Sequence, residues 1–339
     1  MRRAPFLQEE PMEYLNAYTW GHGSPRGFTK KSDAWKHSMD EMILSSGCDT
    51  LLLPVAARQD HAFSTQVDFE TDDVMSMEDA ETVCTYAREK GLKIIIKAMV
   101  NCRDGYWRAY IRFFDTWVPT EPTWAEWFQS YTAFTTELSK LAEKVHAELF
   151  CVGCEMVGTD HRADEWRALI REARKHYHGP ITYNCDKFQE DHVTWWDELD
   201  VISSSGYYSI DQLDFHFDRI KAVSEKFRRP FMFMECGCPS RDGSQYVPNN
   251  WNFGGELSQE AQRLWFDAFC HCLLKNEWVR GNGWWDWSAM RLYPPEKAME
   301  NNGYCTYKKP SEQVLLAFSQ QVAAREQKQG HCPCTQSRK

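Results

Sequence analysis

The sequence predicts a single (β/α)8 TIM barrel of the α/β class, and three observations lead to that prediction. Eight short apolar runs alternate with mainly helical connections along a chain of 339 residues, which is long enough for one such barrel. Most of the runs lack period-2 alternation, which is typical of parallel strands covered on both faces. A doubly wound sheet favours a glycine-rich phosphate turn after its first strand, but residues 20–25 contain proline where the helix should begin.

The predicted strands and helices follow from this pattern in chain order. We expect strands at residues 14–19, 49–54, 93–100, 148–156, 181–185, 201–206, 231–237 and 281–287. Helical patterns lie at 32–46, 78–90, 124–146, 163–176, 210–227 and 258–275, with one helical turn near 195–199. Gly47 and Gly91 each stand between a helix and the next strand, where a left-handed glycine is expected. Ser258 is the predicted N-cap of the helix that follows it.

The barrel domain is predicted to cover residues 1–326, and residues 327–339 are expected to form a disordered polar tail. This tail contains the segment His331-Cys332-Pro333-Cys334, which offers three soft metal ligands. Because no fourth ligand lies nearby in the sequence, an inert tail is the better interpretation. We therefore predict no metal site and no cofactor.

Composition excludes several classes of partner. The chain has 39 Lys and Arg against 49 Asp and Glu, a net charge of −10, so we expect no nucleic-acid or anionic-membrane surface. No apolar run is long enough to span a bilayer, and the N-terminus lacks the apolar core of a signal peptide. Thirteen cysteines, most of them in apolar segments, favour reduced thiols over a disulfide framework. These features predict a cytoplasmic protein.

Aromatic residues are abundant: the chain has 15 Trp, 14 Tyr and 19 Phe, and many of the tryptophans lie in polar segments. A sugar-binding cleft uses flat amphipathic rings, because a pyranose face stacks on an indole while the ring N–H stays available. For any single tryptophan, anchoring a large core is the alternative interpretation.

Two glutamates follow apolar strands directly. Glu155 ends the predicted fourth strand and Glu235 ends the seventh, and barrel enzymes place their chemistry at these carboxyl ends. Paired carboxylates hydrolyse glycosidic bonds, one as the proton donor and the other as the nucleophile or as the base that activates water. The structural alternative is that each glutamate forms a buried salt bridge with an arginine of a neighbouring strand, such as Arg58.

Four segments resemble glycoside hydrolase family 113 of clan A, a family of retaining endo-β-1,4-mannanases. They are CVGCEM at 151–156, PITYNCD at 180–186, VISSSGYY at 201–208 and FMECGCP at 233–239, and the resemblance extends over roughly residues 12–318. It implies that Glu155 is the acid/base and Glu235 the nucleophile. Many clan members have Asn before the acid/base, where it binds the sugar 2-hydroxyl. This chain has Cys154 there, which leaves the sugar specificity open.

Further site residues are predicted from their places after strands. Tyr207 is expected to hold Glu235 ionised, by analogy with the clan, and only one of Tyr207 and Tyr208 can point inward. Period-2 alternation puts Trp285 and Trp287 on one face, and one of them is the expected sugar platform. The predicted substrate-binding residues are Trp20, Arg58, Asp60, Asn101, Asn184, Tyr208, Trp251, Trp285 and Trp287.

The sequence therefore predicts a retaining β-glycoside hydrolase that cleaves β-1,4-mannan or mannooligosaccharides, with that carbohydrate as its partner. Alternatives within the same fold are an exo-β-mannosidase or a hydrolase of xylan, glucan or chitosan oligosaccharides. A non-catalytic sugar-binding barrel is the alternative of a different class, and two retained glutamates argue against it. A metal hydrolase is disfavoured because the first strand end lacks a His-x-His pattern.

Overall fold

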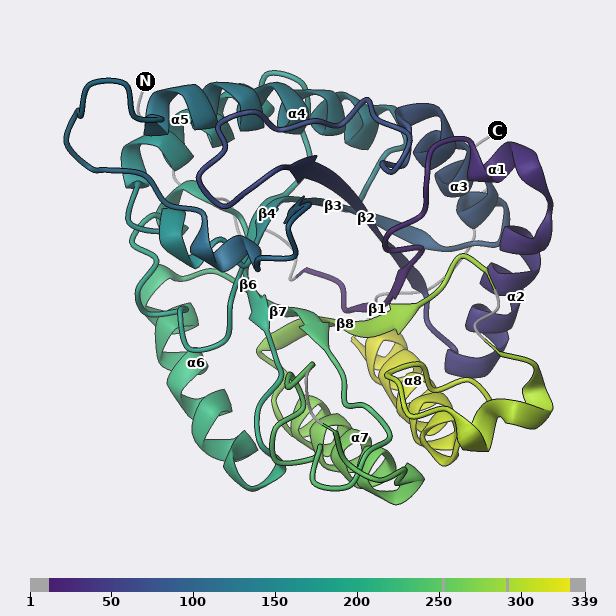
Figure 1. Ribbon diagram of the computed structural model, residues 1–339. Coiled ribbons are helices and arrows are strands. Elements are labelled where there is room, and N and C mark those ends of the chain that lie inside the picture. The colour runs from purple at the N-terminus through teal and green to yellow at the C-terminus, as the bar shows by residue number, and fades with distance from the viewer. Residues whose placement is uncertain (1–11, 252–253, 291–292, 330–339) are drawn as a thin grey trace.

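A computed structural model describes residues 12–251, 254–290 and 293–329. Eight parallel strands form a closed barrel in sequence order, and helices surround it (Figure 1). The strands are β1 Leu15–Trp20, β2 Thr50–Gln59, β3 Lys93–Cys102, β4 Leu149–Cys154, β5 Ile181–Cys185, β6 Ile202–Ser205, β7 Phe231–Cys236 and β8 Val279–Trp287. The helices are α1 Phe28–Lys31, α2 Ala34–Ser46, α3 Met77–Glu89, α4 Trp124–Lys144, α5 Ala163–Ala173, α6 Leu213–Phe227, α7 Gln259–Lys275 and α8 Pro310–Lys328. The predicted (β/α)8 barrel is confirmed.

Local signals in the sequence account for several helix ends. Gly47 ends α2 at φ 63° and Gly91 lies between α3 and β3 at φ 83°, the left-handed conformation expected of glycine there. The side chain of Ser258 accepts a hydrogen bond from the backbone N–H of Ala261 and caps α7, as predicted.

Strand β2 and helix α8 are among the elements that differ from the prediction. Strand β2 runs to Gln59, although Pro54 was expected to end it. The pairing of β1 with β2 ends at Leu52, so on the β1 side of β2 no strand pairs with the proline, which cannot donate an N–H. Helix α8 was not predicted and begins with Pro310, which suits a first helical turn. It extends to Lys328, so the start of the predicted tail is helical, while the His-Cys-Pro-Cys segment lies outside the described residues.

The core has two layers. A small cluster inside the barrel contains Leu52, Ile95, Met232 and other apolar side chains of the strands. A much larger cluster fills the space between the strands and the outer helices. Eight of the fifteen tryptophans are almost fully buried, namely Trp20, Trp35, Trp127, Trp166, Trp195, Trp196, Trp265 and Trp284. Core packing, and not sugar binding, therefore explains about half of the tryptophan content.

Asn16 in β1 connects the first strand to the last elements of the chain. Its side-chain N–H donates to Ser319 Oγ of α8 at 2.8 Å. Its Oδ1 accepts from Asn282 Nδ2 at 3.1 Å and from Trp284 Nε1 at 3.2 Å, both in β8. This buried network closes the barrel where β1 meets β8.

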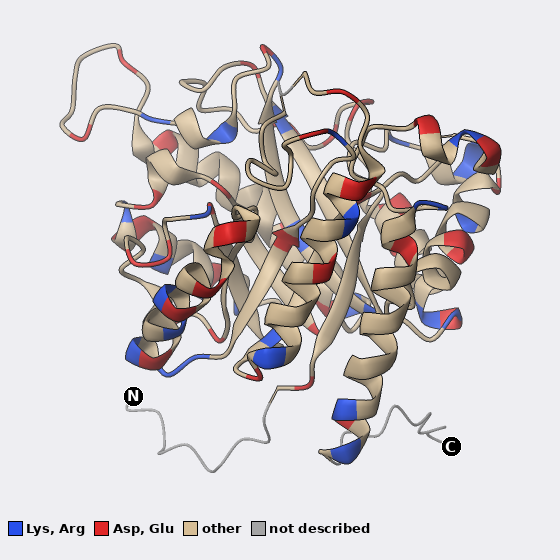
Figure 2. Ribbon diagram, turned by 90° about the horizontal axis from the view of Figure 1, so that it is seen from below, with Lys and Arg blue, Asp and Glu red and all other residues tan. Residues whose placement is uncertain are grey.

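The surface carries charge of both signs. Lysines, arginines and acidic residues interleave along the outer helices and loops in Figure 2.

The eleven cysteines within the described residues are all free and buried. Within that part of the chain, no helix is long and apolar enough to cross a membrane.

Candidate active site

Glu155 and Glu235 lie at the carboxyl ends of β4 and β7 and are 7% and 3% exposed. Glu155 directly follows β4 in the left-handed region, at φ 52°, and its backbone N–H donates to the carbonyl of Asn184 at 2.7 Å. A non-glycine residue in this conformation needs support from its surroundings. The β5 carbonyl provides that support and fixes where the side chain leaves the strand.

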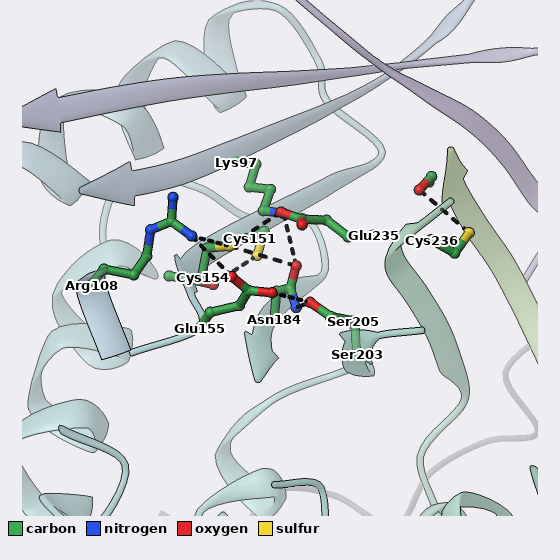
Figure 3. Close-up of polar contacts among 12 residues, drawn as sticks. Lys97, Arg108, Cys151, Cys154, Glu155, Asn184, Ser203, Ser205, Glu235 and Cys236 are labelled. Atoms are coloured by element: carbon green, nitrogen blue, oxygen red, sulfur yellow. Dashed lines mark hydrogen bonds and ion pairs between the residues drawn. The ribbon is translucent and has the colours of Figure 1, made fainter. Parts of the chain in front are cut away.

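A chain of hydrogen bonds through three side chains connects the two carboxylates (Figure 3). Ser205 Oγ donates to Glu155 Oε1 at 2.6 Å, and Asn184 Nδ2 donates to Ser205 Oγ at 3.1 Å. Lys97 Nζ donates to Asn184 Oδ1 at 2.7 Å and also to Glu235 Oε1. Residues from β3, β5 and β6 thus bring the two glutamates, 80 positions apart in sequence, into one site.

Glu235 is surrounded by donors that favour its charged form. Besides Lys97, the hydroxyl of Tyr207 donates to Oε2 at 3.1 Å and the thiol of Cys154 to Oε1 at 3.4 Å. Burial acts to raise the pKa of Glu235, but the charge and hydrogen bond of Lys97 and the charge of Arg108 outweigh it. The net result is a pKa below the usual 4.5, so Glu235 is an ionised carboxylate.

Glu155 has the opposite electrostatic balance. Burial and the negative charge of Glu235 raise its pKa above 4.5, against the lowering effect of Arg108. Arg108 Nη1 donates to Glu155 Oε2 at 3.0 Å, and Trp107 Nε1 donates to the same oxygen at 3.3 Å. Of the two carboxyl groups, Glu155 therefore holds a proton to the higher pH.

Both glutamates are paired with cations, as the structural alternative required, but Arg58 is not one of them. Arg58 Nε instead contacts Asp73 Oδ2 at 3.0 Å on the rim. Lys97 and Arg108 each hold one carboxylate, and these two carboxylates share a continuous polar network. A structural salt bridge needs only one acid and one cation. A site with a general acid and a nucleophile needs two carboxyl groups whose pKa values are shifted in opposite directions, as those of Glu155 and Glu235 are.

Aromatic rings stand beside Glu235 at the β7–β8 side of the mouth. Trp285 is mostly buried, and its ring centroid is 5.0 Å from that of His22 and 6.2 Å from that of Trp251. Trp251 is exposed and packs on Tyr304 at 4.6 Å. His22 Nε2 and Trp285 Nε1 are buried without a hydrogen-bond partner among the described residues. Buried polar nitrogens of this kind are available to hydrogen-bond a ligand.

Three other predicted residues, Asn184, Asn101 and Asp60, bind side chains of the site or its rim. Asn184 is fully buried and occupied by the network, so it positions Lys97 and Ser205. Asn101 accepts from Arg108 Nη2 at 2.6 Å. Asp60 is an exposed rim carboxylate 3.5 Å from Arg103 Nε.

Three predicted substrate-binding residues, Trp20, Tyr208 and Trp287, lie outside the site, and their prediction was wrong. Trp20 packs on Phe28 and Trp35. Tyr208 donates a hydrogen bond to Glu190 and stacks on His216, and Trp287 donates one to Ser38. All three side chains belong to the layer between the strands and the outer helices. For Trp287, the reason is a register shift in the β1–β8 pairing, where Tyr18 pairs with Trp284 but Trp20 with Trp287. Strict alternation therefore fails at the end of β8, and Trp285 alone reaches the site.

Lys97, Arg108, Ser205, His22 and Tyr304 of this site were not predicted from the sequence. Lys97 carried a signal, because a lysine inside the apolar run of residues 94–100 must be paired once the strand is buried. Arg108 and Ser205 carried none, since a loop arginine and one serine among three are unremarkable in the sequence. No group of His, Cys, Asp or Glu within the described residues is arranged to hold a metal ion.

Known proteins were compared with the chain as a whole. The family model for Glycoside Hydrolase Family 113 matches residues 18–309. A solved structure described as a complex of a GH113 β-1,4-mannanase is 43% identical, with 91% of this chain and 99% of that chain covered and a TM-score of 0.89. The GH113 β-mannanase of Alicyclobacillus acidocaldarius, in complex with ManMIm, is 33% identical, with 92% and 99% covered and a TM-score of 0.87.

More distant structures share the fold alone. A β-glucuronidase of Ruminococcus gnavus is 15% identical, with 91% of this chain and 50% of that chain covered and a TM-score of 0.61. No curated protein matches the chain. The family model and the two β-mannanase structures agree with each other and cover nearly all of the barrel. The chain belongs to glycoside hydrolase family 113 and is a glycoside hydrolase.

Proposed function

We propose that this protein is a retaining endo-β-1,4-mannanase that acts by double displacement. The observation that carries the proposal is the polar network that joins a carboxyl group of raised pKa, Glu155, to one of lowered pKa, Glu235. The similarity to solved structures described as β-1,4-mannanases supports the substrate class.

The first step uses the two glutamates in different roles. Glu155 donates its proton to the glycosidic oxygen as the bond to the anomeric carbon breaks, and the leaving sugar departs as an alcohol. Glu235 attacks the anomeric carbon, and its carboxylate becomes an ester in a glycosyl-enzyme. In the second step, Glu155 removes a proton from water, the water oxygen attacks the anomeric carbon, and Glu235 leaves as a carboxylate.

Lys97 and Tyr207 act through Glu235. Their donors keep the carboxylate ionised before attack and stabilise it again when it leaves in the second step. Arg108 and Trp107 orient Glu155 through Oε2, while Ser205 donates to its other oxygen, Oε1. Cys154 replaces the clan asparagine, and its thiol donates to Glu235, so it assists the nucleophile and does not take over the 2-hydroxyl contact.

The test is reducing-end release and product sizing on β-1,4-mannan and mannooligosaccharides. Native protein is compared with Glu155→Ala and Glu235→Ala, and with the exposed carboxylate variant Glu225→Gln as a control. We expect mannan turnover to be lost in both alanine variants and kept in the control. Products of several lengths indicate endo action, whereas release of mannose alone indicates an exo-β-mannosidase.

Added azide assigns the two roles with an activated aryl glycoside. In Glu155→Ala, azide attacks the glycosyl-enzyme and gives a β-glycosyl azide; in Glu235→Ala, it replaces the nucleophile and gives the α anomer. The reverse pattern would exchange the two roles. Turnover of xylan, glucan or chitosan oligosaccharides without turnover of mannan would replace the proposed substrate.

The proposal includes a cytoplasmic location. Eleven free, buried thiols within the described residues support it, because reduced cysteines persist in a reducing compartment. Fractionation of cells of the source organism, followed by detection of this protein with an antibody, tests the location.

A further inference from the structure

The connection between β3 and α4 exposes an unusual number of aromatic rings. Tyr106 is 63% exposed, Trp107 41%, Tyr110 63%, Phe114 59% and Trp117 78%. Exposed apolar side chains that gather in one place mark a binding site, whereas single scattered ones are ordinary.

Three of the five rings contact one another and form a group that we call the loop cluster: Tyr106, Trp107 and Tyr110. The ring of Tyr110 lies 6.4 Å from that of Tyr106 and 6.1 Å from that of Trp107, each in edge-to-face geometry. Such contacts stabilise a fixed arrangement of the rings.

The backbone that carries the loop cluster is anchored to the barrel. Arg108, between two cluster residues, donates from Nε to the carbonyl of Val100 at 3.0 Å and from Nη2 to Asn101 at 2.6 Å. Gly158 permits a close approach on the other side, because a Cβ there would lie 2.2 Å from the carbonyl oxygen of Ile111. The cluster is therefore presented by a rigid loop and needs little ordering when a ligand binds.

Trp107 places the loop cluster beside the proton donor, since its indole N–H donates to Glu155 Oε2 at 3.3 Å. The proton donor of a glycosidase stands next to the oxygen of the leaving sugar. A second aromatic group, with Trp251, Trp285 and Tyr304, lies on the β7–β8 side, across the barrel from β3 and β4 (Figure 1). The two groups thus flank the reacting carboxylates from opposite sides.

From this arrangement we infer that the loop cluster binds the sugar residues on the leaving-group side of the scissile bond. The occupant is the reducing-end part of a β-1,4-mannan chain, whose pyranose faces stack on the exposed rings. This inference rests on the proposed function and extends it, because it states which part of the substrate the β3–α4 loop recognises. The same surface binds a sugar acceptor in the second step. Glu155 then removes the proton of the acceptor hydroxyl, its oxygen attacks the anomeric carbon in place of water, and Glu235 leaves as a carboxylate, which yields a longer oligosaccharide.

The test uses the double variant Tyr106→Ala/Tyr110→Ala and leaves Trp107 unchanged, because Trp107 touches Glu155. Two substrates are compared: mannopentaose, whose leaving group is a sugar chain, and an aryl β-mannobioside, whose leaving group is a phenol. We expect KM for mannopentaose to rise roughly tenfold, the effect of losing stacking on two rings. We expect kcat and KM for the aryl substrate to stay within about twofold.

The matched control is Phe215→Ala, which removes an equally exposed ring from the outer helix α6. An unchanged KM for mannopentaose in the double variant would overturn the inference, as would an equal change for both substrates. Failure of the proposed function looks different, because the native enzyme would then cleave neither substrate. As a second readout, the ratio of oligosaccharide synthesis to hydrolysis at high mannobiose concentration should fall in the double variant.

Discussion

Lys97 and Glu235 form an ion pair inside the barrel, with side chains that are 0% and 4% exposed. Both charges are buried, so each depends on the other and on the neighbouring donors. The lysine is bound on its other side by Asn184, which continues the network towards Glu155. Any change at Lys97 therefore acts first on the charge of the nucleophile.

Replacing Lys97 by methionine tests this dependence. The change keeps the length of the side chain but leaves the buried carboxylate of Glu235 without its main cation, so its pKa should rise. We expect kcat/KM to fall by about a hundredfold or more and the acid limb of the pH profile to move to higher pH. Lys140→Met on the surface of α4 is the control. An acid limb at its original pH would argue that Lys97 has only a structural role.

Tyr207→Phe removes one hydrogen bond to the nucleophile. Loss of the 3.1 Å bond to Glu235 Oε2 should lower kcat/KM by about tenfold to a hundredfold, the range for a hydrogen bond to a charged group. The adjacent Tyr208→Phe is a matched control, because Tyr208 donates to Glu190 outside the barrel. Tyr208→Phe should lower the melting temperature with little effect on kcat. Equal losses of kcat/KM in the two variants would contradict the assignment.

The pH dependence of kcat/KM should be bell-shaped, with limbs on either side of about pH 4.5. Below its lowered pKa Glu235 takes up a proton and loses its nucleophilic form, and above its raised pKa Glu155 loses the proton that it must donate. Steady-state rates across the acidic to neutral range measure both limbs. In Glu155→Ala with an activated aryl leaving group, the alkaline limb should disappear and the acid limb should remain. Persistence of the alkaline limb would assign it to another residue.

His22→Phe tests the polar nitrogen beside Trp285. Burial, with the positive charge of Arg108, lowers the pKa of His22 to about 4, so its ring is neutral at neutral pH. Phenylalanine keeps a ring in contact with Trp285 but cannot exchange a hydrogen bond with a sugar hydroxyl. We expect kcat/KM to decrease by about tenfold for both mannopentaose and the aryl mannobioside. A wild-type value for both substrates would remove His22 from the sugar site.

Asp160 provides a prediction about stability. It is buried, its Oδ1 accepts from Tyr183 at 2.6 Å, and burial raises its pKa from 3.8 to about 8. Between these two values the folded state holds a proton that the unfolded state has lost, so this group makes the protein less stable as pH rises from about 4 to 8.

Asp160→Asn should remove this pH dependence, because the amide cannot ionise and its carbonyl still accepts from Tyr183. The free energy of unfolding of the variant relative to native protein should increase between pH 4 and 8 and stay constant above pH 8. Urea denaturation across that range measures it, with the exposed Asp164→Asn as the control. A difference that does not change with pH would show that Asp160 is ionised in the folded protein.

The sequence predicted the barrel and its two glutamates because both depend on local pattern. Apolar runs without alternation indicate buried parallel strands, and Glu155 and Glu235 follow such runs directly. The residues that set the charges of the two glutamates were not predicted, since Lys97 meets Glu235 only after β3 and β7 have taken their places in the closed barrel. Pairing across the barrel leaves no periodic signal in the chain.

Errors in the predicted site had a local cause. The assignment of Trp287 relied on strict alternation, which a register shift against β1 interrupts. The hydroxyl of Tyr207 donates to Glu235, whereas that of its neighbour Tyr208 donates to Glu190 outside the barrel. Which way the side chain of a residue after a strand points therefore depends on how that strand pairs with its neighbour.

The contacts of Asn16 have a consequence for how the protein is made. Asn16 is among the first described residues to leave the ribosome, but its partners Asn282, Trp284 and Ser319 are among the last. One edge of β1 therefore has no partner until β8 has been synthesised. A chain released early would leave the edges of β1 and β7 open to pairing with other chains. We therefore expect termination before β8 to produce an aggregation-prone fragment and not a smaller barrel.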